Sequence, residues 1–133
     1  MKYLITGGKG FIGTHLFNQL VSNGHECFVL DIENMGVLNK ENFTCFQKKK
    51  IDVVIHLASK THVPESWEEP EEYLEFNYLG TLNTIEFCRK NKAKMIYVSS
   101  YMYGKPDYLP IDENHKLRVN NPYALSKKLS EQE

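Results

Sequence analysis

The chain has 133 residues, of which 41% are hydrophobic and 25% charged, a composition that fits one compact domain with a sizeable core. Its formal net charge of −1 at pH 7 provides no general attraction to nucleic acid or to an anionic membrane surface. Three scattered cysteines, Cys27, Cys45 and Cys88, favour a reducing compartment over a disulfide framework, and the histidines lack metal-ligand spacing. The N-terminal apolar run is too short for a signal peptide or a membrane span. We therefore expect a cytoplasmic protein without a metal site, a nucleic-acid partner or a membrane association.

Strands and helices alternate along the sequence. Apolar runs and helical spacing predict strand 3–6, helix 11–22, strand 26–31, strand 51–59, helix 71–90, strand 94–100 and helix 121–132. Pro70 suits the first turn of the long helix, and Asn121 followed by Pro122 suits the start of the last one. This alternation predicts an α/β fold of the Rossmann-like type, a doubly wound parallel sheet with ligands at the carboxyl ends of its strands.

Residues 32–50 are the least regular part of the pattern. A parallel edge strand at "FTCFQ" would require Lys48 to Lys50 to cross the sheet, and three residues reach only about 10 Å. We therefore predict a short helix over 40–49 that begins after Asn39 and carries Phe43 and Phe46. The third strand of such sheets is then reduced to residues 36–38.

The stretch "TGGKGFIG" places Gly7, Gly10 and Gly13 between the first strand and the first helix. A tight turn and close backbone approach both need glycine, and the helix terminus offers unpaired N–H groups to a pyrophosphate. Asp31 ends the second strand 18 residues after Gly13, near the distance at which an acid binds the ribose hydroxyls of adenosine. Because a carboxylate repels a 2′-phosphate and no arginine follows Asp31, the pattern favours NAD over NADP.

Five motifs resemble those of the extended short-chain dehydrogenase/reductase family, in its NAD-dependent epimerase/dehydratase group that acts on nucleotide sugars. They are "TGGKGFIG", "VIHLAS", "EFNYLGTLN", "VSSYMYG" and "YALSK", and they occur in the family's order across the chain. The resemblance implies that residues 1–133 form an NAD-binding Rossmann-like domain. It also implies that the domain is incomplete, because family enzymes continue beyond the Tyr-x-x-x-Lys helix into more strands and a substrate domain.

The resemblance also implies roles for individual residues. His56 to Ser59 would border the cofactor, and Asn77 would anchor the neighbouring strand or the cofactor site. Ser99, four residues before Tyr103, would be the catalytic serine, with Ser100 as the alternative if the loop is one residue shorter. Thr61 would contact the substrate or the cofactor. The full set implied for the cofactor is Gly7, Gly10, Phe11, Ile12, Gly13, Asp31, Leu57, Ala58, Ser59, Asn77, Tyr123 and Lys127, and the set implied for the substrate is Thr61 and Ser100.

Tyr123 and Lys127 are four residues apart, which places both side chains on one face of a helix. A phenol with a pKa near 10 is a poor base at neutral pH, so a nearby ammonium must stabilise the phenolate by about 4 kcal/mol in a dry site. Tyr123 would then take the proton of a sugar hydroxyl while hydride passes to the nicotinamide, and Ser99 would hydrogen-bond the reacting oxygen.

Several alternatives remain at this point. Sugar dehydratases with these motifs carry Asp-Glu where this chain has Ser100 and Tyr101, so we favour 4-epimerisation over dehydration. The short segment 32–50 resembles that of keto-sugar reductases, which makes reduction the second candidate. The third is a non-catalytic dinucleotide-binding module, because only six residues follow Lys127. A chain that ends there exposes a sheet edge, so we expect a homo-oligomer, and a nucleotide sugar would bind only if another chain completes the site.

Overall fold

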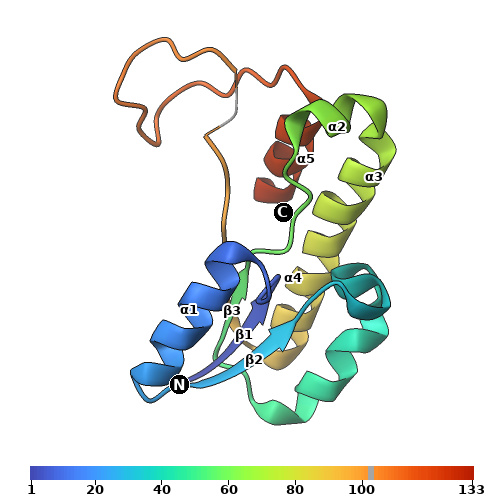
Figure 1. Cartoon of the computed structure of the whole chain (residues 1–133), viewed down its shortest axis with the longest axis vertical. Coiled ribbons are helices and arrows are strands. Elements are labelled where there is room, and N and C mark those ends of the chain that lie inside the picture. The colour runs from blue at the N-terminus through green and yellow to red at the C-terminus, as the bar shows by residue number, and fades with distance from the viewer. Residues whose placement is uncertain (102–103) are drawn as a thin grey trace.

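The computed structural model describes residues 1–101 and 104–133, apart from the side chain of residue 34. Its centre is a parallel four-stranded sheet with the order β2-β1-β3-β4 (Figure 1). The strands are β1 (Lys2–Thr6), β2 (Glu26–Leu30), β3 (Val53–His56) and β4 (Lys94–Tyr97). The strands predicted over 3–6 and 26–31 are confirmed in position, and the strands predicted over 51–59 and 94–100 are confirmed with shorter ends.

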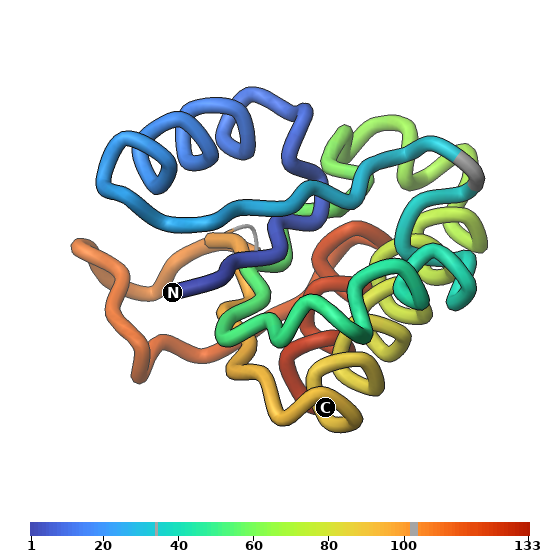
Figure 2. Tube along the Cα trace, turned by 90° about the horizontal axis from the view of Figure 1, so that it is seen from below, coloured from blue at the N-terminus to red at the C-terminus, as the bar shows by residue number. Residues whose placement is uncertain are grey.

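Helices cover both faces of the sheet. Helix α1 (Phe11–Ser22) lies on one face, and the long helical segment after β3 lies on the other with the last helix (Figure 2). The elements of that second layer are α2 (Val63–Glu68), α3 (Pro70–Leu74), η3 (Glu75–Leu79), α4 (Gly80–Asn91) and α5 (Pro122–Glu131). The predicted Rossmann-like, doubly wound α/β fold is therefore confirmed.

The helix predicted over 71–90 is confirmed, with one irregularity. Segments α3 and α4 are joined by η3, a single π-helical turn that contains Asn77. Pro70 begins the segment, where its missing N–H costs no helical hydrogen bond. π-helical turns inside α-helices shift the direction of the following side chains and occur frequently at functional sites.

Residues 33–49 form two 3₁₀ helices, η1 (Glu33–Leu38) and η2 (Lys40–Lys49). The helix predicted at 40–49 is confirmed in place: the Asn39 side chain accepts a 3.0 Å hydrogen bond from the backbone N–H of Glu41. The strand predicted at 36–38 is wrong. Met35 and Gly36 both have positive φ, 65° and 52°, so the chain turns tightly where an edge strand would need extended backbone.

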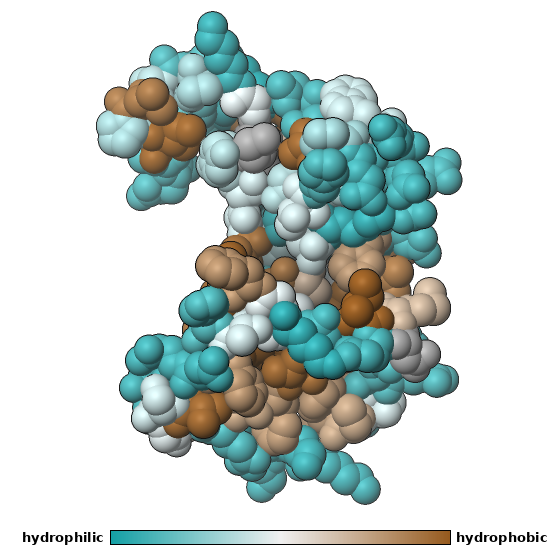
Figure 3. Space-filling view, in the orientation of Figure 1, coloured by the Kyte–Doolittle hydropathy of each residue, from teal (hydrophilic) through white to brown (hydrophobic). Residues whose placement is uncertain are grey.

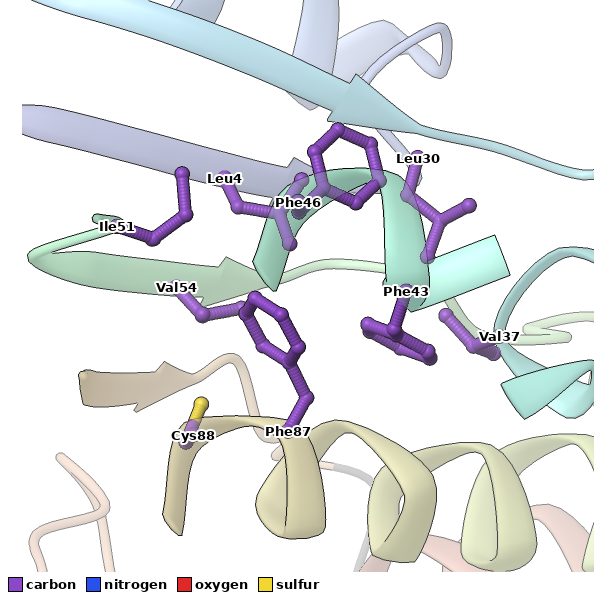
Figure 4. Close-up of a cluster of buried hydrophobic side chains, with 9 residues drawn as sticks. All are labelled: Leu4, Leu30, Val37, Phe43, Phe46, Ile51, Val54, Phe87 and Cys88. Atoms are coloured by element: carbon purple, nitrogen blue, oxygen red, sulfur yellow. The ribbon is translucent and has the colours of Figure 1, made fainter. Parts of the chain in front are cut away.

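A cluster of nine buried apolar side chains lies between the sheet and the second helical layer (Figure 4). Phe43 from η2 packs against Phe87 from α4, with ring centroids 5.2 Å apart. The cluster consists of Leu4, Leu30, Val37, Phe43, Phe46, Ile51, Val54, Phe87 and Cys88. It fixes η1 and η2 against the sheet, because burying each large apolar side chain contributes about 1.5–3 kcal/mol.

The chain leaves the sheet after β4 and joins the second helical layer again at α5. Residues 98–101 and 104–121 contain no helix or strand, and they form the extended arm in Figure 1. The molecular surface is hollowed between this arm and α1 (Figure 3). β4 is an edge strand, and its Ile96 side chain is 52% exposed.

Candidate active site

The loop between β1 and α1 turns on glycines that leave no room for side chains. Gly7 has a φ of +70°, and a Cβ there would lie 2.8 Å from the backbone nitrogen of Ala58. A Cβ on Gly13 would lie 2.4 Å from the carbonyl oxygen of Gly7. Gly10 is the N-cap residue of α1, so the first N–H groups of this helix have no side-chain cap. A helix terminus of this kind carries positive potential and can bind a phosphate.

A cavity of about 210 Å³ opens beside this loop, where β1, β2 and β3 end. It is lined by Gly7, Gly10, Leu30, Asp31, Ile32, Gly36, Val37, Leu57, Ala58, Ser59 and Phe76. Six of the predicted cofactor residues therefore meet at one cavity. The lining combines an apolar floor with one carboxylate and the backbone of the glycine loop, a composition typical of nucleotide sites.

Asp31 is held at the rim of this cavity. Its Oδ2 accepts a 2.6 Å hydrogen bond from the backbone N–H of Lys9, and its Oδ1 accepts a 2.9 Å bond from that of Ile32. The Lys9 ammonium is paired with Glu33. Each carboxylate oxygen keeps a further lone pair, so Asp31 can accept hydrogen bonds from a diol without moving.

Other predicted contact residues lie outside the cavity lining. Phe11 and Ile12, at the start of α1, are 84% and 59% exposed. Gly13 is buried beneath the loop, where its role is to allow close packing. Thr61 is exposed and follows Ser59 by two residues. The contacts of these residues with a cofactor or a substrate stay predictions.

His56, which the resemblance places beside the cofactor, is not among the residues that line this cavity. Its ring lies inside the second layer, with Nδ1 2.6 Å from Thr6 Oγ1 and Nε2 3.0 Å from Thr81 Oγ1. Burial lowers the pKa of His56 to about 3, and the nearby charge of Lys127 adds to this effect. His56 is therefore a neutral, hydrogen-bonded core residue, placed on the helix-facing side of β3 by the alternation of side chains along the strand.

Tyr123 and Lys127 lie on the buried face of α5, as their spacing predicts. The Asn121 side chain accepts a 2.7 Å hydrogen bond from the backbone N–H of Ala124, which caps the helix two residues before the tyrosine. Tyr123 is 7% exposed and Lys127 is 4% exposed. The Tyr123 ring packs edge-on against Tyr73, with centroids 6.5 Å apart. α5 thus presents a phenol and an ammonium side by side from one helix face.

Lys127 reaches across to the end of β4. Its Nζ donates a 2.7 Å hydrogen bond to the carbonyl oxygen of Val98 and lies 4.3 Å from the centroid of the Tyr97 ring. Burial lowers the pKa of Lys127 to about 8, and the Glu131 carboxylate opposes this shift only in part. The ammonium is therefore still charged at neutral pH, close to the carboxyl edge of the sheet.

The two candidate serines follow β4. Ser99 donates a hydrogen bond to the Glu131 carboxylate, one helical turn beyond Lys127. Ser99 and Ser100 both line a second cavity, of about 410 Å³, between the end of β4 and the arm. The choice between them as the catalytic serine stays open, because the motif that contains them runs into residues 102 and 103, which lie outside the described residues.

A third cavity, of about 560 Å³, lies between α2 and the arm. It is lined by Val63, Trp67, Tyr101, Gly104, Pro106, Leu109, Ile111, Asn120 and Asn121. The N-cap of α5 is part of this lining. Helix α5, which carries Tyr123 and Lys127, therefore begins beside a cavity large enough for a small ligand.

Sequence patterns did not identify every residue of this site. Ser126, inside "YALSK", receives a 2.8 Å hydrogen bond from the side chain of Asn77, and Glu131 accepts the Ser99 hydroxyl. Ser126 faces the interior because it follows the buried Tyr123 by three positions on α5, a signal that a helical projection could have provided. The Val98 carbonyl belongs to the backbone, so no side-chain pattern marks it.

The described residues contain no helix long and apolar enough to cross a membrane. Within the same residues, no group of three or more His, Cys, Asp or Glu side chains could hold a metal ion.

Comparison with known families gives a match over nearly the whole chain. Residues 3–133 match the family described as the NAD dependent epimerase/dehydratase family. A putative UDP-glucose 4-epimerase of Methanocaldococcus jannaschii is 36% identical over 149 aligned residues, which cover 97% of this chain and 48% of that protein. The chain thus spans about half the length of this curated relative.

Solved structures give the same picture. The UDP-glucose 4-epimerase of Thermus thermophilus, in a complex with NAD, superposes with a TM-score of 0.90 at 32% identity. The superposition covers 99% of this chain and 49% of the epimerase chain. A dTDP-4-dehydrorhamnose reductase from Clostridium acetobutylicum superposes with a TM-score of 0.90 at 26% identity, covering 99% of this chain and 48% of that one. The fold is therefore shared with both epimerases and reductases.

Proposed function

The chain belongs to the NAD dependent epimerase/dehydratase family, and from this membership we propose that it is the NAD-binding part of a nucleotide-sugar 4-epimerase. The observation that carries the proposal is one hydrogen-bonded connection. Ser59 lines the cavity beside the glycine loop, and Asn77 joins Ser59 to the helix of Tyr123 and Lys127. A nucleotide site and a proton-transfer pair therefore share one edge of the sheet.

The residues of the cavity fit NAD. A Cβ on Gly7 or Gly13 would collide with neighbouring backbone, so these glycines allow the tight turn after which the N–H groups at the start of α1 can bind a pyrophosphate. Asp31 can accept the hydroxyls of the adenosine ribose, and Leu57 to Ser59 can border the rest of the molecule. NAD supplies the hydride acceptor that epimerisation needs.

The side chains of the chain itself would handle the proton. Tyr123 takes the proton of the sugar 4-hydroxyl as a phenolate, which the charge of Lys127 stabilises, and becomes a neutral phenol. Ser99, released from Glu131, would hydrogen-bond the reacting sugar oxygen, with Ser100 as the alternative. Inversion would be completed by return of the hydride to the opposite face of the sugar carbon, while Tyr123 returns the proton to the sugar oxygen. The two cavities beside the arm, bordered by Ser99 and Asn121, offer room for the sugar.

Keto-sugar reduction is the second candidate. The segment between β2 and β3 is two short 3₁₀ helices, and the reductase from Clostridium acetobutylicum shares the fold over 99% of this chain. The same Tyr123 would then donate a proton to a ketone instead of taking one from an alcohol. A module that binds NAD without turnover is the third reading, because the chain spans about half of its relatives.

Compartment and assembly are part of the proposal. Cys27, Cys45 and Cys88 are all free thiols, which suits the cytoplasm. Self-association would cover the edge of β4, where Ile96 and Val98 are 52% and 38% exposed. Light scattering tests this: a clean monomer at all concentrations would contradict the homo-oligomer.

The function is tested in two steps. Calorimetric titration of the chain with NAD⁺ and NADH is expected to show binding, and no heat from either would contradict every cofactor-based reading. Interconversion of UDP-glucose and UDP-galactose is then assayed with wild type and Tyr123→Phe, with Tyr3→Phe on β1 as the matched control. Turnover lost only in Tyr123→Phe supports the epimerase. Oxidation of NADH by a keto sugar supports the reductase, and binding without turnover supports the module.

A further inference from the structure

Asn77 lies where three segments meet. It is 2% exposed and sits in the π-helical turn η3. Its Oδ1 accepts hydrogen bonds from the backbone N–H of Lys60 at 2.8 Å and from Ser59 Oγ at 3.1 Å. Its Nδ2 donates to the carbonyl oxygen of Lys60 at 3.0 Å and to Ser126 Oγ at 2.8 Å. An asparagine amide has two donors and two lone pairs, so every hydrogen-bonding position of this side chain is occupied.

Ser126 is the residue of α5 whose side chain forms a hydrogen bond with Asn77. It is fully buried, and its hydroxyl both receives the Asn77 amide and donates a 2.8 Å hydrogen bond to the carbonyl oxygen of Tyr123. Ser130, one turn later, donates to the carbonyl oxygen of Asn77 at 3.1 Å. Two hydroxyls of α5 therefore bind one residue of η3, and one of them also touches the backbone of the tyrosine.

The loop on the other side of Asn77 is fixed as well. Lys60 follows Ser59 directly, and its ammonium forms ion pairs with Glu65 at 3.3 Å, Glu69 at 3.4 Å and Glu72 at 2.5 Å. The loop is thus held by Asn77 from inside and from outside by the carboxylates of Glu65 on α2, Glu72 on α3 and Glu69 between the two helices. A displacement of the loop at the cavity is transmitted to Asn77 because the loop has little freedom to absorb it.

We propose that Ser126 is a positioning residue that couples the nucleotide cavity to the Tyr123 and Lys127 pair through Asn77. Ser59 contacts the cavity at one end of this connection, and Ser126 contacts the Tyr123 carbonyl at the other. A nucleotide that orders Leu57 to Ser59 thereby orders α5, and a correctly placed α5 favours binding in return. The proposal rests on the proposed function, since it takes NAD as the nucleotide.

The hydroxyl of Ser126, rather than its volume, carries this role. Alanine removes both hydrogen bonds and leaves an N–H of Asn77 buried without its partner. Cysteine fills the space, but its thiol is a weak acceptor and donor. Threonine keeps the hydroxyl. The three replacements therefore separate hydrogen bonding from packing at one position.

The test measures NAD⁺ affinity by calorimetry between pH 6.5 and 9.5 on folded protein. Ser126→Ala and Ser126→Cys are each expected to weaken binding at least fivefold and to move the midpoint of its pH profile, while Ser126→Thr is expected to stay within twofold of wild type. Ser22→Ala, whose hydroxyl bonds only the Gln19 carbonyl on the opposite face, is the matched control. The midpoint of the pH profile of NAD⁺ binding reports on the titration of Lys127. The Ser126 hydroxyl does not touch Lys127, so a loss of packing alone would leave this midpoint unchanged.

The experiment distinguishes a failure of the coupling from a failure of the proposed function. Absence of NAD⁺ binding by wild type would remove the premise and with it the proposal. Binding by wild type with unchanged affinity and midpoint in Ser126→Cys would overturn the coupling while leaving the proposed function intact. The cysteine variant decides if the alanine variant does not fold.

Discussion

The Lys127 ammonium donates its 2.7 Å hydrogen bond to the carbonyl oxygen of Val98, and none of the ion pairs among the described residues includes Lys127. A carbonyl dipole compensates only part of the cost of burying a charge. The Tyr97 ring, 4.3 Å from Nζ, adds a cation–π contact. Lys127 is therefore a charge held in a costly position, on the same buried helix face as Tyr123.

This cost predicts a pH dependence of stability. The pKa of Lys127 is lowered from 10.5 to about 8 by burial, so between pH 8 and 10.5 the unfolded chain binds a proton that the folded chain has lost. Stability from this group therefore rises with pH across that window, by about 1 kcal/mol between pH 7 and 9. Urea denaturation gives the free energy of unfolding of wild type and Lys127→Met at both pH values. The contribution of Lys127 is the change, from pH 7 to pH 9, in the difference between the two proteins.

The methionine variant also removes the burial cost itself. We expect it to be more stable than wild type at pH 7 and to lose the advantage as the pH rises. Lys128→Met, one position further along α5, is the matched control. A constant difference for Lys127→Met would contradict the lowered pKa.

His56 predicts how the stability depends on pH in the acidic range. Its pKa is lowered from 6.5 to about 3, so below pH 6.5 the unfolded chain binds a proton that the folded chain refuses. Stability from this group is lost as the pH falls, by about 1.5 kcal/mol between pH 6.5 and 5. Denaturation of His56→Gln should show a smaller loss over this range. His62→Gln, which changes an imidazole with a 71% exposed side chain, is the matched control.

Much of the fold follows from local patterns. Alternating apolar runs, the glycine turn at Gly7 and the caps at Asn39 and Asn121 locate the strands and helices within a few residues. The strand at 36–38 failed because sequence alone did not reveal that Met35 and Gly36 adopt positive φ. An apolar triplet can pack from a 3₁₀ turn as well as from a strand, and the tertiary contact of Val37 with the core decides between them.

The site is less predictable than the fold. The spacing of Tyr123 and Lys127 is enough to place them together, because a helix brings residues four apart onto one face. The resemblance of "VIHLAS" to the family motif placed His56 beside the cofactor, and a buried parallel strand carries no polar alternation to show which face a side chain joins. Its partners Thr6 and Thr81 come from distant parts of the chain.

Gly13 predicts a steric effect on nucleotide binding. A Cβ at this position would lie 2.4 Å from the Gly7 carbonyl oxygen and 2.6 Å from the Gly8 Cα, both backbone atoms that cannot yield without moving the loop. Gly13→Ala should therefore weaken NAD⁺ binding more than tenfold by calorimetry. Gly10→Ala is the matched comparison, because its Cβ meets only the Gly7 oxygen at 3.3 Å and should cost less. Equal losses in the two variants would show that loop packing does not set the affinity.

Asp31 predicts cofactor preference. Its carboxylate is fixed by the N–H groups of Lys9 and Ile32 at the rim of the cavity, so a 2′-phosphate would meet a negative charge that cannot swing away. Asp31→Asn keeps the shape but removes the charge, and it should bind NAD⁺ less tightly while binding NADP⁺ more tightly, which changes the ratio of the two dissociation constants at least tenfold. Asp52→Asn is the matched control: Asp52 also accepts a backbone N–H, from Lys2 at 2.7 Å, at the opposite end of the sheet. A ratio that shifts equally in both variants would mean that Asp31 does not read the ribose.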